Sequence, residues 1–265
     1  MIGQRELSLL ARAGHVSERA QEQDYVLSWL LAARGVRGPA NLVFKGGTAL
    51  RRCYFENYRY SQDLDFTLLR PAPPNELSAT LSSWFSWVRD GTGIVCGFAR
   101  DPATEGQGFV AYISYTGPLR GGGTVKFDAN SDETIRTPVE TCRILSPYSD
   151  LTQPPEVAVY SLVEIWAEKV RSLVQRSEPR DLYDISELAG HDRALPGQGL
   201  PVFLQKMEDK GLGRHRLVER LNSAETTFAR LWEMRLVDQV SPLPEFQETW
   251  RRVRRVLRAG GYLAY

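Results

Sequence analysis

The stretch FKGGTALRRCYFENYRYSQDLDF, residues 44–66, places a lysine and two glycines a short distance before two aspartates that are separated by one residue. Because side chains alternate along a β-strand, Asp63 and Asp65 are predicted to share one face of a strand over 63–69. Two carboxylates on one face repel each other unless a cation or solvent lies between them. Mg²⁺ takes one or two carboxylates together with water and phosphate oxygens. The pair therefore indicates a metal–nucleotide site, although a solvated acidic edge strand would carry the same two residues.

The glycines favour the metal–nucleotide interpretation. Gly46 and Gly47 are expected to turn the chain before a helix over 49–56, which Thr48 would cap. Backbone N–H groups in a glycine turn and at a helix N-terminus bind anions, and Lys45 adds a positive charge beside them. A tight turn alone would explain two glycines. The turn, the helix start and the paired aspartates together predict a triphosphate-binding site.

Around this stretch the periodicity predicts an α+β protein with a mixed sheet. A proline- and serine-rich segment, SPYSDLTQPP, suggests a boundary near residue 150. The expected division is a core over 1–150 and a helical domain over 151–265. Helices are expected over 18–34, 75–89, 156–176, 180–189, 200–210, 215–235 and 245–258, and further strands over 41–44, 93–98, 108–115 and 124–129.

Composition is that of an ordinary globular protein, since 42% of the 265 residues are hydrophobic, 25% are charged and the net charge is +1. The three cysteines, Cys53, Cys96 and Cys142, form no C-x-x-C pair and fit reduced thiols better than a disulfide framework or a zinc site. No apolar run is long enough to span a bilayer, and the first residues lack a signal-peptide pattern. These features predict a cytoplasmic protein.

Two further residues are candidates for the same chemistry. Asp128 lies on the predicted strand TVKFDA and would be a third carboxylate if that strand pairs with the one that bears Asp63 and Asp65. Lys169 falls inside the apolar arc of its helix, so its ammonium must reach solvent or an anion. The anion is either a structural carboxylate, Asp181 or Asp184, or a nucleotide phosphate. If it is the phosphate, replacing Lys169 with Met should leave stability unchanged or raise it.

The motifs resemble those of a known family. FKGGTAL followed by RYSQDLDF looks like the first motif of the AbiEii/AbiGii-type nucleotidyltransferase toxins, which are related to the MenT toxins and the DNA polymerase β-like superfamily. The block VEIWAEKVRSLVQRSEPRDLYDISEL, residues 163–188, resembles the second motif of that family, and QDYVLSWLL, residues 23–31, its N-terminal helix. The resemblance implies a nucleotidyltransferase-type sheet core and a helical C-terminal domain that contributes Lys169 and Asp181.

The resemblance also implies an activity. NMP would pass from an NTP to an acceptor hydroxyl, expected to be the 3′ end of tRNA, with Mg²⁺ or Mn²⁺ as cofactor and a cognate antitoxin as partner. The implied metal ligands are Asp63, Asp65 and, by a weaker match, Asp128; the implied nucleotide-binding residues are Lys45, Gly46, Gly47 and Ser61, and the catalytic set adds Lys169 and Asp181. A small-molecule nucleotidyltransferase and a non-catalytic nucleotide-binding protein are the alternatives.

Arginines are concentrated near the end of the chain, in RRVRRVLR, residues 251–258. On a helix, Arg251, Arg254, Arg255 and Arg258 would share one face. Such a face is usually only solvated, but it would also suit contact with RNA phosphates.

Overall fold

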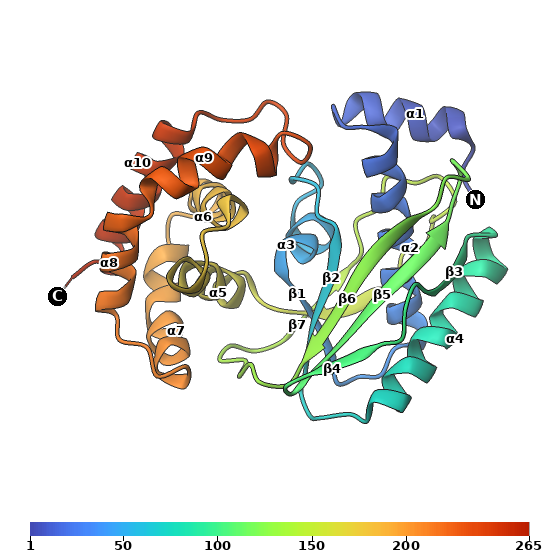
Figure 1. Cartoon of the computed structure of the whole chain (residues 1–265), viewed down its shortest axis with the longest axis horizontal. Coiled ribbons are helices and arrows are strands. Elements are labelled where there is room, and N and C mark those ends of the chain that lie inside the picture. Colours follow the sequence, from blue (N-terminus) through green and yellow to red (C-terminus); the bar gives the residue numbers. More distant parts are fainter. Residues whose placement is uncertain (265) are drawn as a thin grey trace. The chain divides into compact units, whose positions relative to one another are not determined.

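The computed structural model describes residues 1–264, apart from the side chain of Glu105, and divides the chain into two compact units (Figure 1). Unit 1 comprises Met1–Glu133 and Val139–Val159. Unit 2 comprises Thr134–Pro138 and the chain from Tyr160 onward. The chain therefore leaves unit 1 for five residues and returns before it enters unit 2 again.

Unit 1 is built on one mixed sheet, formed by eight strands of the described residues in the order β3-β5-β6-β2-β1-β8-β7, with β4 paired to β5. The β2–β6 and β1–β8 pairs are parallel and the other pairs are antiparallel. The strands are β1 (Leu42–Lys45), β2 (Asp63–Leu68), β3 (Val95–Phe98), β4 (Ala103–Glu105), β5 (Gly108–Thr116), β6 (Gly123–Asn130), β7 (Glu140–Arg143) and β8 (Glu156–Val159).

Unit 1 also contains helical segments. They are α1 (Gln4–Ala13), α2 (Glu18–Arg37), α3 (Gly46–Ala49), the π-helical turn η1 (Leu50–Tyr54) and α4 (Pro74–Thr92). Ser17 caps the N-terminus of α2, and its side chain accepts a hydrogen bond from the Ala20 N–H at 3.1 Å. Helix α4 is followed by Gly93, which takes the left-handed conformation that glycine adopts without a steric penalty.

Aromatic side chains form the centre of the unit 1 core. Trp84 of α4 packs edge-on against Phe66 of β2 and Phe127 of β6, at ring-centroid distances of 6.3 and 5.9 Å. Trp29 of α2 lies 5.6 Å from Trp87 of α4, so the two helices meet over the same side of the sheet (Figure 1). The apolar side chains of β2 pack into this layer on one face of the sheet, and its aspartates lie on the other face.

Unit 2 is helical. Its helices are α5 (Leu162–Gln175), α6 (Pro179–His191), α7 (Leu195–Asp209), α8 (His215–Ser223), α9 (Glu225–Leu236) and α10 (Phe246–Ala259). The segment 134–138 is held to these helices by Glu164, which accepts hydrogen bonds from the backbone N–H groups of Arg136 and Thr137 at 3.1 and 2.9 Å. Lys206 donates to the Thr134 carbonyl at 3.1 Å. Buried side chains of unit 2 thus bind a segment that interrupts the sequence of unit 1.

Several sequence expectations are confirmed and others are corrected. The mixed sheet and the helical second half are present, and the described residues contain three free cysteines. The helix expected over 156–176 is wrong at its start, because Glu156–Val159 is a strand that pairs with β1 and β7. The units accordingly separate at Val159 and not near 150. The helix expected over 215–235 is divided at Ala224 into α8 and α9.

Within residues 1–264, no helix has both the length and the apolar character that crossing a membrane requires.

Candidate active site

The acidic face of the sheet, which we define as Asp63 and Asp65 of β2 and Asp128 of β6, forms the first part of the candidate site. Asp63 and Asp65 are half-buried, whereas Leu64 and Phe66 are fully buried on the opposite face. This confirms the predicted alternation. Strands β2 and β6 run parallel, and Asp128 lies opposite Asp65 in the register.

The acidic face does not assemble a three-carboxylate metal site. Within the described part of the chain, no group of three or more histidine, cysteine, aspartate or glutamate side chains is placed to hold a metal ion. Asp128 instead pairs with Lys126 of the same strand, at 2.7 Å between Oδ2 and Nζ. Asp128 as a third metal ligand therefore stays a prediction. Two aspartates still match Mg²⁺, which keeps several waters and takes its remaining ligands from substrate phosphates.

The carboxylate of Asp65 is the poorly compensated member of this face. Burial and the neighbouring charges of Asp63 and Asp128 raise its pKa, while Lys45 and Lys126 oppose the shift. Because the pKa is raised on balance, the two lysines do not fully offset burial and the other carboxylates. An oxygen donor set that is short of positive charge fits a divalent cation.

The glycine turn lies directly beside these acids. Helix α3 begins at Gly46, immediately after Lys45 at the end of β1, and continues into η1. The sequence suggested that Thr48 would cap a helix over 49–56, but Thr48 lies inside α3. Its hydroxyl donates a hydrogen bond to the backbone carbonyl of Asp63 at 2.6 Å. The turn is thereby tied to the strand that carries the acids.

Close approach explains why both turn positions are glycine. Gly46 has a φ of 81°, and a Cβ there would lie 2.8 Å from Oδ2 of Asp65. A Cβ on Gly47 would collide with the Arg59 guanidinium and lie 3.3 Å from the Ser61 hydroxyl. The structure therefore brings the predicted residues Gly46, Gly47, Ser61 and Asp65 to one place.

Gly46→Ala should destabilise the protein more than Gly106→Ala, and we expect it to impair activity as well. Both glycines have positive φ, 81° and 60°, but a Cβ on Gly106 meets no atom within 4 Å. Each alanine costs about 1–2 kcal/mol for the left-handed backbone. Only Gly46→Ala also presses on Asp65. Urea unfolding of the two variants measures the difference, and equal destabilisation would show that the Gly46–Asp65 contact costs nothing.

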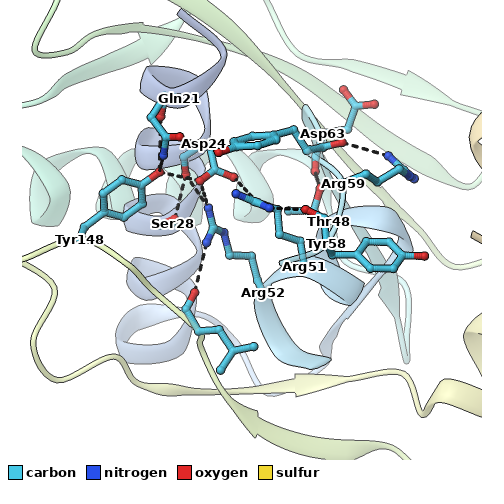
Figure 2. A network of polar contacts seen from close by, with 12 residues as sticks. Gln21, Asp24, Ser28, Thr48, Arg51, Arg52, Tyr58, Arg59, Asp63 and Tyr148 are labelled. Carbon is cyan, nitrogen blue, oxygen red and sulfur yellow. Dashed lines mark hydrogen bonds and ion pairs between the residues drawn. The ribbon is translucent and has the colours of Figure 1, made fainter. Parts of the chain in front are cut away.

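A buried polar network fixes the helical turn that follows the glycines (Figure 2). Asp24 of α2 accepts a hydrogen bond from Nε of Arg51 at 2.9 Å and forms an ion pair with Arg52. Tyr148 donates its hydroxyl to Asp24 at 2.5 Å. Burial alone would raise the pKa of Asp24, but the two arginines and Tyr148 hold it below its usual value. The network anchors both arginines of η1 and therefore the end of the segment that begins at Gly46.

Sequence reasoning missed Asp24, Arg51, Arg52 and Arg59 in this region. The available signal was a charged residue inside the apolar run QDYVLSWLL and three arginines within 51–59. Arg59 is 3% exposed and donates Nη1 to the Tyr60 carbonyl at 3.1 Å. It places a second cation beside the turn that already carries Lys45.

Lys169 and Asp181 form a separate cluster in unit 2. Nζ of Lys169 lies 2.9 Å from Asp181 and 2.7 Å from Asp184, and both carboxylates are fully buried. Arg176 adds a second contact to Asp181 at 2.8 Å. Burial would raise the pKa of Asp181, but Lys169 and Arg176 hold it far below its usual value.

This arrangement corrects one expectation about stability. Within unit 2, Lys169 pairs with Asp181 and Asp184, the two carboxylates that the sequence offered as possible structural partners. Its ammonium is therefore not an unpaired buried charge. Removing the ammonium should therefore lower stability and not preserve it.

Comparison with known proteins gives consistent results. The sequence profile described as "Nucleotidyl transferase AbiEii toxin, Type IV TA system" matches residues 29–258. The solved structure of MenT4, a nucleotidyltransferase toxin from Mycobacterium tuberculosis H37Rv, is similar at a TM-score of 0.69 and 22% identity, covering 97% of this chain and 89% of that chain. The search of curated proteins gave no match. The profile match spans most of the sequence, and the chain therefore belongs to the AbiEii family of nucleotidyltransferase toxins.

Proposed function

We propose that this nucleotidyltransferase moves a nucleoside monophosphate from an NTP to an acceptor hydroxyl and that it requires Mg²⁺ or Mn²⁺. The observation that carries the proposal is the connection between the glycine turn and the acids. Thr48 hydrogen-bonds to the backbone of Asp63, and the Gly46 backbone lies against the Asp65 carboxylate. A turn suited to phosphate is thus fixed next to two carboxylates suited to a metal.

The residues of unit 1 have distinct roles in this proposal. The acceptor oxygen bonds to the α-phosphorus, the bond to pyrophosphate breaks, and the hydroxyl proton is lost. Asp63 and Asp65 hold the metal, which neutralises charge on the triphosphate. Lys45 neutralises the phosphates, while Gly46, Gly47 and Ser61 contact them. Asp128 is the further metal ligand or the base that takes the proton.

We assign Lys169 and Asp181 of unit 2 to the same nucleotide. Lys169 would neutralise a phosphate, and Asp181 would orient Lys169 through the 2.9 Å ion pair between them. A lysine held by two buried carboxylates has few alternative positions, which suits electrostatic stabilisation of a phosphoryl group.

The proposed acceptor is RNA, specifically the 3′ end of tRNA, and the proposed setting is the cytoplasm with a cognate antitoxin. The family description, which refers to a type IV toxin–antitoxin system, supports the antitoxin. The cationic surface of α10 supports RNA. Arg251, Arg255 and Arg258 are exposed on this helix, whereas Val253 and Leu257 are buried beneath them.

Incubation with each of four α-labelled NTPs, Mg²⁺ and total RNA tests the proposal directly. Label is expected in tRNA from one NTP or a few of them, and pretreatment that blocks the 3′ hydroxyl should abolish it. Label transferred only to a small cationic acceptor would instead identify a small-molecule nucleotidyltransferase. Failure to transfer from any NTP to either acceptor class would contradict the catalytic assignment.

Replacing Arg251, Arg255 and Arg258 with glutamine should weaken RNA modification and flatten its salt dependence. Each arginine–phosphate interaction contributes about 0.7–0.9 to the slope of log K against log salt, so removing three of them should reduce that slope by about 2. Arg254 is left in place because it donates to the Leu221 carbonyl at 2.8 Å and therefore has a structural role.

The matched control removes the same charge from unit 1. Arg5, Arg12 and Arg19 are also exposed, and their replacement with glutamine should leave RNA modification close to that of the parent. Equal effects of the two triple variants across a salt series would mean that α10 is only a solvated surface.

A further inference from the structure

Lys126 is a cation placed within the acidic face itself. It lies two residues before Asp128 on β6, on the same side of the strand, and opposite Asp63 in the parallel register with β2. Its Nζ is 2.7 Å from Oδ2 of Asp128. The three carboxylates of the acidic face therefore have a lysine on the strand beside them as well as Lys45 on the other neighbouring strand.

The Lys126–Asp128 pair contributes little to stability. The side chains are 35% and 24% exposed, and ion pairs between partly exposed side chains add little net stability because solvent screens them. Neither residue belongs to the aromatic core. Its main physical effect is therefore on the electrostatic potential of the acidic face and on the availability of Asp128.

The charges show what the pair does to that face. Lys126 pairs with Asp128 at 2.7 Å and lies on β6, directly beside the strand that bears Asp63 and Asp65. Its positive charge attracts all three carboxylates. The same positive charge repels any divalent cation that approaches Asp63 and Asp65, and it occupies the one carboxylate that would complete a third ligand.

We propose that Lys126 is a resident counter-cation of the acidic face, which keeps Asp128 paired and prevents tight binding of a divalent ion before a nucleotide is present. This inference rests on the proposed function of Asp63 and Asp65 as metal ligands. A triphosphate brings several negative charges to the site and offsets the repulsion from Lys126. The metal is consequently bound tightly only as its nucleotide complex, and the free protein avoids occupation by the ion alone.

Binding of Mn²⁺ to the nucleotide-free protein, followed by electron paramagnetic resonance, tests this role without measuring catalysis. Lys126→Met should bind Mn²⁺ at least about tenfold more tightly than the parent, because a like charge is removed and Asp128 is released. Lys126→Arg keeps the charge and should resemble the parent. In an Asp128→Asn background, Lys126→Met should give a smaller gain, since no third carboxylate is released.

A second arm uses a non-hydrolysable NTP analogue. The gain from Lys126→Met should shrink when the analogue is present, because the triphosphate already offsets the lysine. Unchanged Mn²⁺ affinity in Lys126→Met, with normal folding by circular dichroism, would overturn the inference.

The variant Asp63→Asn/Asp65→Asn separates this failure from failure of the proposed function. If Mn²⁺ binding depends on the two aspartates but not on Lys126, only the counter-cation role is wrong. If Mn²⁺ binding ignores the two aspartates in both the parent and the Lys126→Met background, the metal assignment and the inference are both wrong.

Discussion

Asp65→Asn is expected to abolish nucleotide transfer while making the protein more stable. Phosphoryl transfer depends on positioning and charge neutralisation, so loss of one of the two proposed metal ligands should reduce the rate by about 1,000-fold or more. Stability should rise because burial and the charges of Asp63 and Asp128 disfavour the ionised carboxylate. An increase of about 1 kcal/mol would raise the melting temperature by about 2–4 °C in a protein of this size.

The raised pKa of Asp65 also predicts how the stability of the protein changes with pH. A carboxyl group whose pKa is raised by folding binds its proton more tightly in the folded state than in the unfolded state, where the pKa is about 3.9. Stability therefore falls as pH increases from about 3.9 through the folded pKa of Asp65. Asp65→Asn should remove that fall, which thermal melts across a pH series would detect.

A substitution of the same kind at an exposed site is the control. Asp101 is exposed outside the acidic face, and Asp101→Asn should change neither transfer nor the pH dependence. An Asp65→Asn protein that transfers nucleotide at the parental rate would eliminate the proposed metal site.

Lys169→Met is expected to reduce transfer by about 100-fold or more and to destabilise unit 2 as well. Removing one partner from a buried ion pair leaves the other charge uncompensated and costs about 3–5 kcal/mol. Asp181 retains Arg176, so the destabilisation should lie near the lower end of that range. Transfer rate per folded molecule and urea unfolding, measured on the same preparation, distinguish the two effects.

Lys206 offers a control with nearly the same surroundings. It is a buried lysine of unit 2 that pairs with Glu164 at 2.7 Å and Glu168 at 3.5 Å. Lys206→Met should lose comparable stability but keep its activity per folded molecule. If the two lysine variants show equal rates per folded molecule, Lys169 has only a structural role.

The sequence was informative where local periodicity decides the structure. The alternation of β2 correctly predicted which side chains face the core and that Asp63 and Asp65 share the other face. The apolar arc of α5 correctly predicted that Lys169 would be buried and would need an anion. Both inferences depend only on residues within one element.

Contacts between residues far apart in the sequence could not be predicted in the same way. Strand β8 is a short apolar run, EVAV, that continues into the apolar pattern of α5, and its pairing with β7 and β1 makes it a strand. The arginine partners of Asp24 lie 27 and 28 residues further along the chain, on a turn whose orientation the sequence does not determine. The contact between Gly47 and Arg59 likewise depends on how the intervening turn folds back.

Segment 134–138 belongs to unit 2 although the chain on both sides of it belongs to unit 1. This affects when, during synthesis, the protein can become active. The acids of β2 and the turn after β1 emerge from the ribosome early, but β8, which completes the other edge of β1, follows more than 100 residues after Phe44, at Val159. Glu164 and Lys206, which satisfy the backbone of segment 134–138, emerge later still. A nascent or truncated chain therefore holds the proposed catalytic motif without the contacts that close its fold, so the toxin should acquire its activity only when nearly all of it has been made.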